Sequence, residues 1–116
     1  MSSLIKGWFG LWAACFTFFA YLQLNDPDPI IWTSWYLLAA AFSVAQITIP
    51  FPKWMIAIFI LINLTWAYFQ WPPQFEGFEQ TIPHNVNIER ARETGGLMLI
   101  ALFAAVCLAI PRKKHP

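Results

Sequence analysis

The stretch YLQLNDPDPIIWTSWY, residues 21–36, places a short polar turn between two long apolar runs. Proline cannot continue a helix, and it disfavours helical backbone in the residue before it. Pro27 and Pro29 therefore end one helix and allow the next to begin. Asp26 and Asp28, the only aspartates of the chain, are held in this turn. Asp28 is expected to satisfy free N–H groups at the start of the second helix.

The rest of the chain repeats this pattern of long apolar runs and short polar joints. Of its 116 residues, 59% are hydrophobic and only 11% are charged, whereas a soluble domain has about a quarter charged residues. A membrane span needs roughly 20 mainly apolar residues. The sequence therefore predicts an all-α membrane protein, a four-helix transmembrane bundle with up-and-down topology. The predicted spans lie at about residues 4–24, 30–49, 54–71 and 88–110, in a single domain over residues 1–116, with a loop at 72–87.

The ends of these spans carry two further signals. The first run is expected to stay in the protein as a span, because no small-x-small cleavage site precedes the turn. Asn87 is a favourable N-cap residue and is expected to begin the fourth helix. Tryptophan and tyrosine gather mostly near the predicted helix ends, which is typical of the aromatic belts at the two membrane interfaces.

Lysine and arginine are divided unequally between the two sides of this topology. One side carries five of them and no acid, namely Lys6, Lys53, Arg112, Lys113 and Lys114. The other side carries all six acids and two arginines. The positive-inside rule then predicts cytoplasmic termini, with residues 25–29 and 72–87 extracytoplasmic. The basic tail is expected to contact anionic lipid, and nucleic-acid binding is not expected.

The predicted extracytoplasmic side gathers a polar cluster from two parts of the chain. Its members are Asp26, Asp28, Glu89, Arg90, Arg92 and Glu93. Glu89 and Glu93 are one helical turn apart, so they repel each other unless a cation compensates. One interpretation is structural: Asp26 or Asp28 pairs with Arg90 or Arg92, and thereby ties the first turn to the fourth helix.

The other interpretation of this cluster is a ligand or metal site. Its candidate ligands are Asp26, Asp28, His84, Glu89 and Glu93. Carboxylates suit calcium, magnesium or manganese, and a histidine would admit zinc. However, the spacing matches no metal-binding motif. No cofactor is predicted, and a divalent cation remains the alternative.

Two further features concern packing and the long loop. Ala101, Ala105 and Ala109 are spaced four residues apart, and we expect this stripe to be a helix contact. In the loop, Phe75 and Phe78 flank Glu76. This spacing favours a segment that lies on the membrane interface with its rings down and its acids up, where it covers the polar cluster or docks a partner.

Several classes of membrane protein are disfavoured. A haem held by two histidines needs both within the spans, and His84 and His115 both lie outside them. Proton-coupled transport usually needs acids or histidines in mid-membrane, where this chain has only neutral polar residues such as Asn63. No serine–histidine or cysteine–histidine pair shares a depth suited to nucleophilic catalysis.

The NDPDP turn, the aromatic residues Trp32 and Tyr36 and an E-x-x-R-E-x-x-G-L opening of the last span (residues 89–97) together resemble the transmembrane protein 220 family. The resemblance covers the whole chain in its order of four short spans. It implies a small multipass membrane protein, and it carries over no catalytic residue.

Three functions are consistent with the sequence. The first hypothesis is a non-enzymatic membrane subunit or scaffold, embedded in the lipid bilayer, that meets a membrane-protein partner or a second copy of itself. The second is a protein that binds a cation or small ligand through the extracytoplasmic carboxylates. The third is a membrane enzyme with a carboxylate-bound metal. The metal content of the purified protein distinguishes the first hypothesis from the other two.

Overall fold

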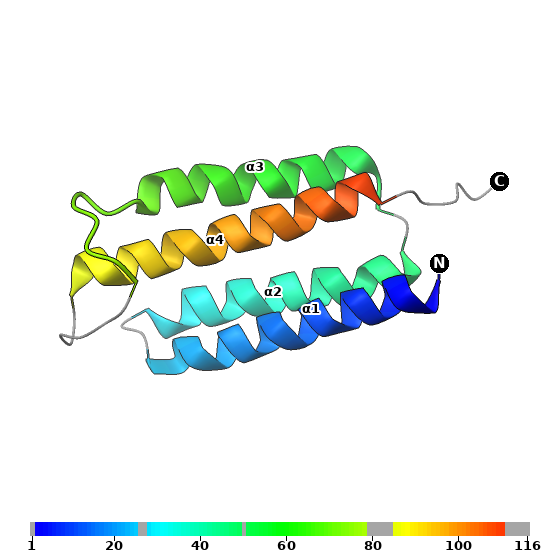
Figure 1. Ribbon diagram of the computed structural model, residues 1–116, viewed down its shortest axis with the longest axis horizontal. Coiled ribbons are helices and arrows are strands. Elements are labelled where there is room, and N and C mark those ends of the chain that lie inside the picture. The colour runs from blue at the N-terminus through cyan, green and yellow to red at the C-terminus, as the bar shows by residue number, and fades with distance from the viewer. Residues whose placement is uncertain (1, 26–27, 50, 79–84, 111–116) are drawn as a thin grey trace. The chain divides into compact units, whose positions relative to one another are not determined.

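The computed structural model describes residues 2–25, 28–49, 51–78 and 85–110. All regular structure in these ranges is helical (Figure 1). The elements are α1 (Ser3–Leu22), the short 3-10 helix η1 (Gln23–Asn25), α2 (Pro29–Thr48), α3 (Lys53–Gln70) and α4 (Val86–Ala109). Four helices are long and apolar enough to cross a membrane. The predicted all-α architecture with four spans is therefore confirmed, and each span lies within about two residues of its expected bounds.

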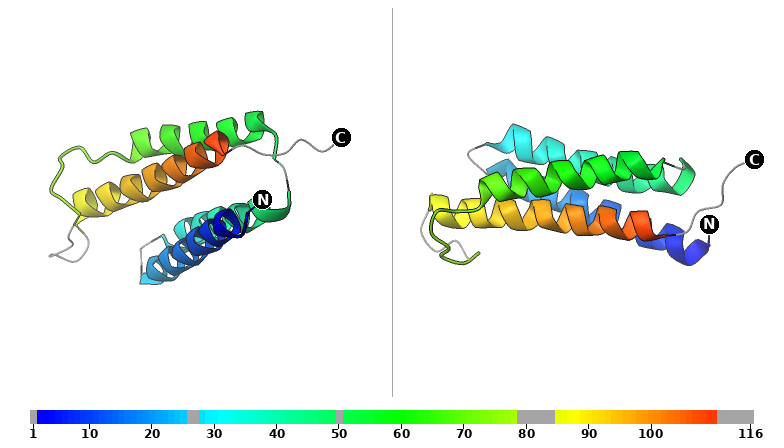
Figure 2. Two further views of the ribbon diagram at one scale, coloured as in Figure 1. Left: turned by 45° about the vertical axis from the view of Figure 1, so that its right-hand side comes forward. Right: turned by 90° about the horizontal axis from the view of Figure 1, so that it is seen from above.

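The chain divides into two compact units, each formed by a helical hairpin. In both views of Figure 2, α1 runs antiparallel to α2, and α3 runs antiparallel to α4. Proline occupies the first position of α2, as expected, since its missing N–H would have no helical partner there. Asp28 is the N-cap residue, but its side chain makes no capping hydrogen bond. The expected role of the Asp28 carboxylate as a helix cap is therefore wrong.

Two hydroxyl groups set the register of the α1–α2 hairpin. The Ser43 hydroxyl donates to the Phe9 carbonyl over 2.6 Å, and the Thr33 hydroxyl donates to the Ala20 carbonyl over 3.3 Å. The Ser43–Phe9 bond lies nearer the open end of the hairpin, and the Thr33–Ala20 bond lies nearer its turn. Buried residues of α1 recur every three or four positions, which is the period of one helix face. They are Phe9, Ala13, Phe16 and Ala20.

The α3–α4 hairpin buries one continuous face of α4. This face carries residues of mixed size at intervals of three or four, and it lies over the smaller buried set of α3, Ile56, Asn63 and Ala67. The Asn63 amide donates to the Phe59 carbonyl of its own helix over 2.8 Å, so this polar group is satisfied inside the span. On α4 the buried set is Ile88, Ala91, Thr94, Leu97, Ile100, Ala101, Phe103, Ala104 and Cys107.

The expected alanine stripe on α4 is only partly a contact surface. Ala101 is buried, but Ala105 and Ala109 are exposed. A step of four residues turns a helix by more than one full turn, so a stripe at that spacing moves away from a fixed partner. The buried face instead continues from Ala101 in steps of three to Ala104, which is fully buried, and Cys107. Ala105 therefore lies outside the α3–α4 contact.

Neighbouring alanines on α4 give a matched test of this face. Ala104→Leu should lower the free energy of unfolding by about 1–3 kcal/mol, because the added carbons have no space in a packed face. Ala105→Leu, one residue further on, should leave stability close to that of the parent. Thermal unfolding of the two purified variants in detergent measures the difference, and equal midpoints would contradict the assignment of the buried face.

Candidate functional site at the α3–α4 connection

The start of α4 extends beyond the end of α3. The Thr94 hydroxyl donates to the Ala67 carbonyl over 3.4 Å, which places the ninth residue of α4 beside the last turn of α3. With 24 residues, α4 is about 36 Å long at 1.5 Å per residue, whereas the hydrocarbon core is about 30 Å thick. The difference is about one helical turn, and because charge is costly within hydrocarbon, the charged residues at positions 89–93 are expected at the edge of the membrane.

Arg90 bonds to the end of α3. Its guanidinium donates to the carbonyl of Phe69 over 2.9 Å. The last carbonyls of a helix have no partner within the helix, and the C-terminus favours positive charge. Arg90 satisfies one of these carbonyls and places its charge at the favourable end of α3. This use of Arg90 was not anticipated from the sequence, which suggested partners only among acids.

Glu93 also contacts α3. Its carboxylate accepts a hydrogen bond from the Gln70 side-chain amide over 3.2 Å. Together with Arg90 and Thr94, it connects α4 to the last turn of α3 at three successive levels. Gln70 and Thr94 are members of the site that sequence reasoning missed. Their positions in the sequence could have indicated this role. Gln70 is a polar residue at the end of the third predicted span, and Thr94 is a polar residue near the start of the fourth.

The first turn of α4 uses its two asparagines differently from the expectation. Asn85 is the N-cap, and its side-chain oxygen accepts from the backbone N–H of Ile88 over 3.3 Å. Asn87 lies inside the helix and donates to the carboxylate of Glu76 over 2.8 Å. The prediction that Asn87 begins the helix is therefore wrong. Its side chain instead fastens the loop to the projecting first turn of α4.

The described part of the loop is an aromatic cluster formed by Trp71, Phe75 and Phe78. The rings of Trp71 and Phe75 are stacked at 5.5 Å with 3° between their planes, and Phe78 meets Phe75 edge-on at 5.4 Å. Pro72 is buried. Gly77 has a φ of 93°, a backbone conformation that favours glycine. These features give the segment a defined shape.

The remaining residues of the predicted polar cluster are placed as follows. Glu89 is half-buried and Arg92 is exposed. Asp26 and His84 lie outside the described residues. Asp28 belongs to the first hairpin and the arginines belong to the second, so its pairing with Arg90 or Arg92 stays a prediction. Among the residues that the structure describes, no three histidine, cysteine or acidic side chains gather as a metal site would require.

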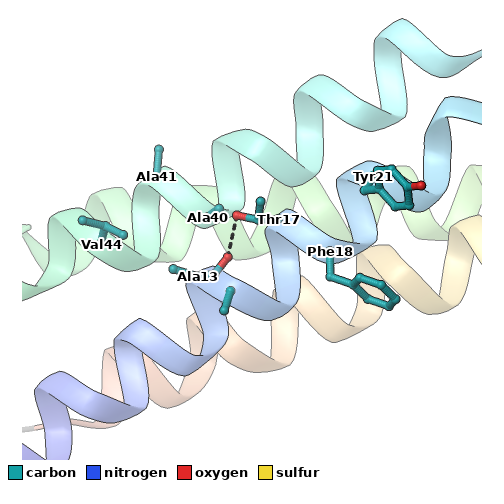
Figure 3. Close-up of a pocket in the computed structure, with 8 residues that line it drawn as sticks. Ala13, Thr17, Phe18, Tyr21, Ala40, Ala41 and Val44 are labelled. Carbon is teal, nitrogen blue, oxygen red and sulfur yellow. Dashed lines mark hydrogen bonds between the residues drawn. The ribbon is translucent and has the colours of Figure 1, made fainter.

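A groove of about 570 Å³ lies on the α1–α2 hairpin (Figure 3). Its lining is mostly small and apolar, and the Thr17 hydroxyl in it donates to the Ala13 carbonyl over 2.8 Å. A groove of this composition within a span offers no acid, histidine or cysteine for chemistry. The lining residues are Ala13, Ala14, Thr17, Phe18, Tyr21, Ala40, Ala41 and Val44.

Comparison with known proteins identifies one family. A family model described as "Transmembrane family 220, helix" matches residues 15–109. No curated protein and no solved structure matches the chain. The matched range begins within α1 and ends at the last residue of α4, so it includes the NDPDP turn and the whole α3–α4 connection. The family suggested by the sequence is confirmed.

The bond between Gln70 and Glu93 can be measured by a double-mutant cycle. Gln70→Ala and Glu93→Ala should each destabilise the hairpin, and the double variant should lose less than the sum of the two. We expect a coupling of about 0.5–1.5 kcal/mol, as for a hydrogen bond between helices near lipid. Gln70→Ala combined with Asn87→Ala is the matched control and should be additive, because Asn87 bonds to Glu76. Additivity in both cycles would refute the Gln70–Glu93 contact.

Proposed function

Since the chain belongs to transmembrane family 220 and is a multipass integral membrane protein, we propose that it acts as a non-enzymatic subunit or scaffold of a membrane assembly. In this role the protein contributes a fixed surface to a partner. The proposed surface is the charged end of the α3–α4 hairpin, at the extracytoplasmic face.

The observation that carries this proposal is the use of polar side chains at that end. Arg90 and Thr94 donate to backbone carbonyls of α3, and Glu93 accepts from Gln70. These bonds hold the hairpin together. A catalytic or transport site usually aims its polar groups into a shared cavity. Here the hydrogen bonds join one helix to the next, as expected of groups that fix a surface.

The polar groups within the spans support the same interpretation. Ser43 and Asn63 are fully buried, and each donates to a backbone carbonyl. Their bonds lie within one hairpin or one helix. Buried polar groups that are satisfied in this way stabilise packing between helices and within them.

Charge suggests the chemistry of the partner. The proposed extracytoplasmic side carries six acids against two arginines. Glu76 is exposed and Glu89 is half-buried at this end of the hairpin, and in this proposal these two carboxylates give the surface its negative charge. We therefore propose a partner that presents lysine or arginine at the same level of the membrane. Complementary charge of this kind favours encounter and fixes orientation.

The proposed orientation has its own test. A reporter that is active only in the cytoplasm should be active at the C-terminus and inactive when inserted between residues 79 and 84. The reason is the five-to-two division of lysine and arginine between the two sides. The reverse pattern of activity would place the charged end of the α3–α4 hairpin in the cytoplasm and reject this part of the proposal.

The proposed role predicts a partner whose retention depends on salt. The tagged full-length chain, purified from its native membrane in mild detergent, should retain one protein at constant stoichiometry, with no stoichiometric metal. Raising the salt concentration should release that protein, because added ions screen exposed charge. Glu89→Gln should weaken retention, whereas Lys53→Gln, at the opposite end of the hairpin, should not. A stoichiometric metal would instead support the cation-binding alternative, and a chain that purifies alone at every salt concentration would reject the subunit role.

A further inference from the structure

The loop at the end of α3 sends neighbouring side chains in opposite directions along α4. Glu76 accepts from Asn87, in the first turn of α4. Two residues later, the Phe78 ring lies against Gly95. A Cβ atom added to Gly95 would be 3.5 Å from the ring, which is van der Waals contact. Asn87 and Gly95 are eight residues apart, which is about 12 Å along a helix axis. The positive φ of Gly77, between Glu76 and Phe78, lets the backbone reverse between these two contacts.

The direction from Asn87 to Gly95 is also the direction into the bilayer. Asn87 lies in the part of α4 that projects past the end of α3, whereas Gly95 follows Thr94, which bonds to the last turn of α3 at Ala67. Phe78 therefore reaches the level at which both helices are inside the membrane. The Glu76 carboxylate therefore lies nearer the end of the hairpin, and the Phe78 ring lies nearer the middle of its two spans.

The α3–α4 hairpin leaves the outer surface of its aromatic cluster open. Trp71, Phe75 and Phe78 retain 53%, 50% and 55% exposure, although each packs against another ring. Open water is an unfavourable surrounding for this much clustered apolar surface. The boundary between headgroups and acyl chains is favourable, and aromatic rings concentrate there.

From this geometry we propose that the segment Trp71–Phe78 is an interfacial anchor. Its three rings are inserted in the leaflet at the α3–α4 end, among the headgroups and upper acyl chains, while Glu76 stays in water. The partner of this surface is the lipid itself. The buried Pro72, the ring stacking and the Glu76–Asn87 bond hold the rings in place before they meet lipid. The anchor does not depend on which side of the membrane this end faces.

The test measures the depth of single positions in the full chain. In a background with Cys15→Ala and Cys107→Ala, Phe75→Cys and Gln74→Cys are each labelled with the environment-sensitive fluorophore NBD. Both variants are reconstituted alone into phosphatidylcholine vesicles that contain a lipid with a nitroxide on its headgroup or, separately, on the middle of its acyl chain. We expect the label at position 75 to emit at shorter wavelength. Quenching there by the headgroup nitroxide should be several-fold stronger than at position 74.

Each outcome decides the proposal. Equal, water-like emission and weak quenching at both positions would overturn it. A label at 75 that is water-like in vesicles but shielded in native membranes would also overturn it, because a protein would then cover the rings. Trp71→Cys, labelled in the same way, gives a second position should Phe75→Cys fail to fold. The result does not depend on the salt-sensitive partner of the proposed function, because the vesicles contain only this chain and lipid.

Discussion

Every backbone N–H and C=O inside a bilayer needs a partner within the protein, because hydrocarbon offers none. This requirement explains the four long helices and the placement of proline near their ends. Polar side chains within the spans face the same constraint, so a hydroxyl buried at a helix contact needs an acceptor. Ser43, Thr33, Thr94 and Arg90 all donate to backbone carbonyls of the helix opposite. Within each hairpin, such bonds connect the helices where apolar packing alone would leave their register free.

The same requirement gives the α3–α4 connection its character. The end of a membrane helix exposes carbonyls just where water becomes scarce, so satisfying them is worth more than at the surface of a soluble protein. Arg90 bonds to one of these carbonyls directly, and Gln70 extends the connection to Glu93. A charged residue at the start of one helix thus stabilises the end of its neighbour. This arrangement explains why an acid-rich segment can lie at the edge of an apolar protein without leaving its charges isolated.

The spans were predictable because their signals are strong and local. Apolar runs of sufficient length and the prolines near their ends set the bounds, and the NDPDP turn and helix-four opening indicated the family. Details that depend on a partner helix were not predictable. Ala105 and Ala104 are identical in sequence terms, and only the rotation of α4 against α3 decides which is buried. Asn85 and Asn87 are equally good caps, and the Glu76 side chain distinguishes them. Gln70 and Thr94 gained their roles from register, which one sequence does not specify. The pairing of the turn aspartates with the arginines stays a prediction.

The lengths of α3 and α4 have a consequence for the surrounding lipid. With 18 residues, α3 is only about 27 Å long, whereas α4 reaches about 36 Å. The added length of α4 consists of its charged first turns, so its apolar part, residues 94–109, is only about 24 Å long, against a hydrocarbon core of about 30 Å. Both helices of the hairpin therefore offer an apolar length slightly below the thickness of an average hydrocarbon core. Lipid beside a short span thins locally at a modest cost, so this hairpin is better matched to thin bilayers than to thick ones.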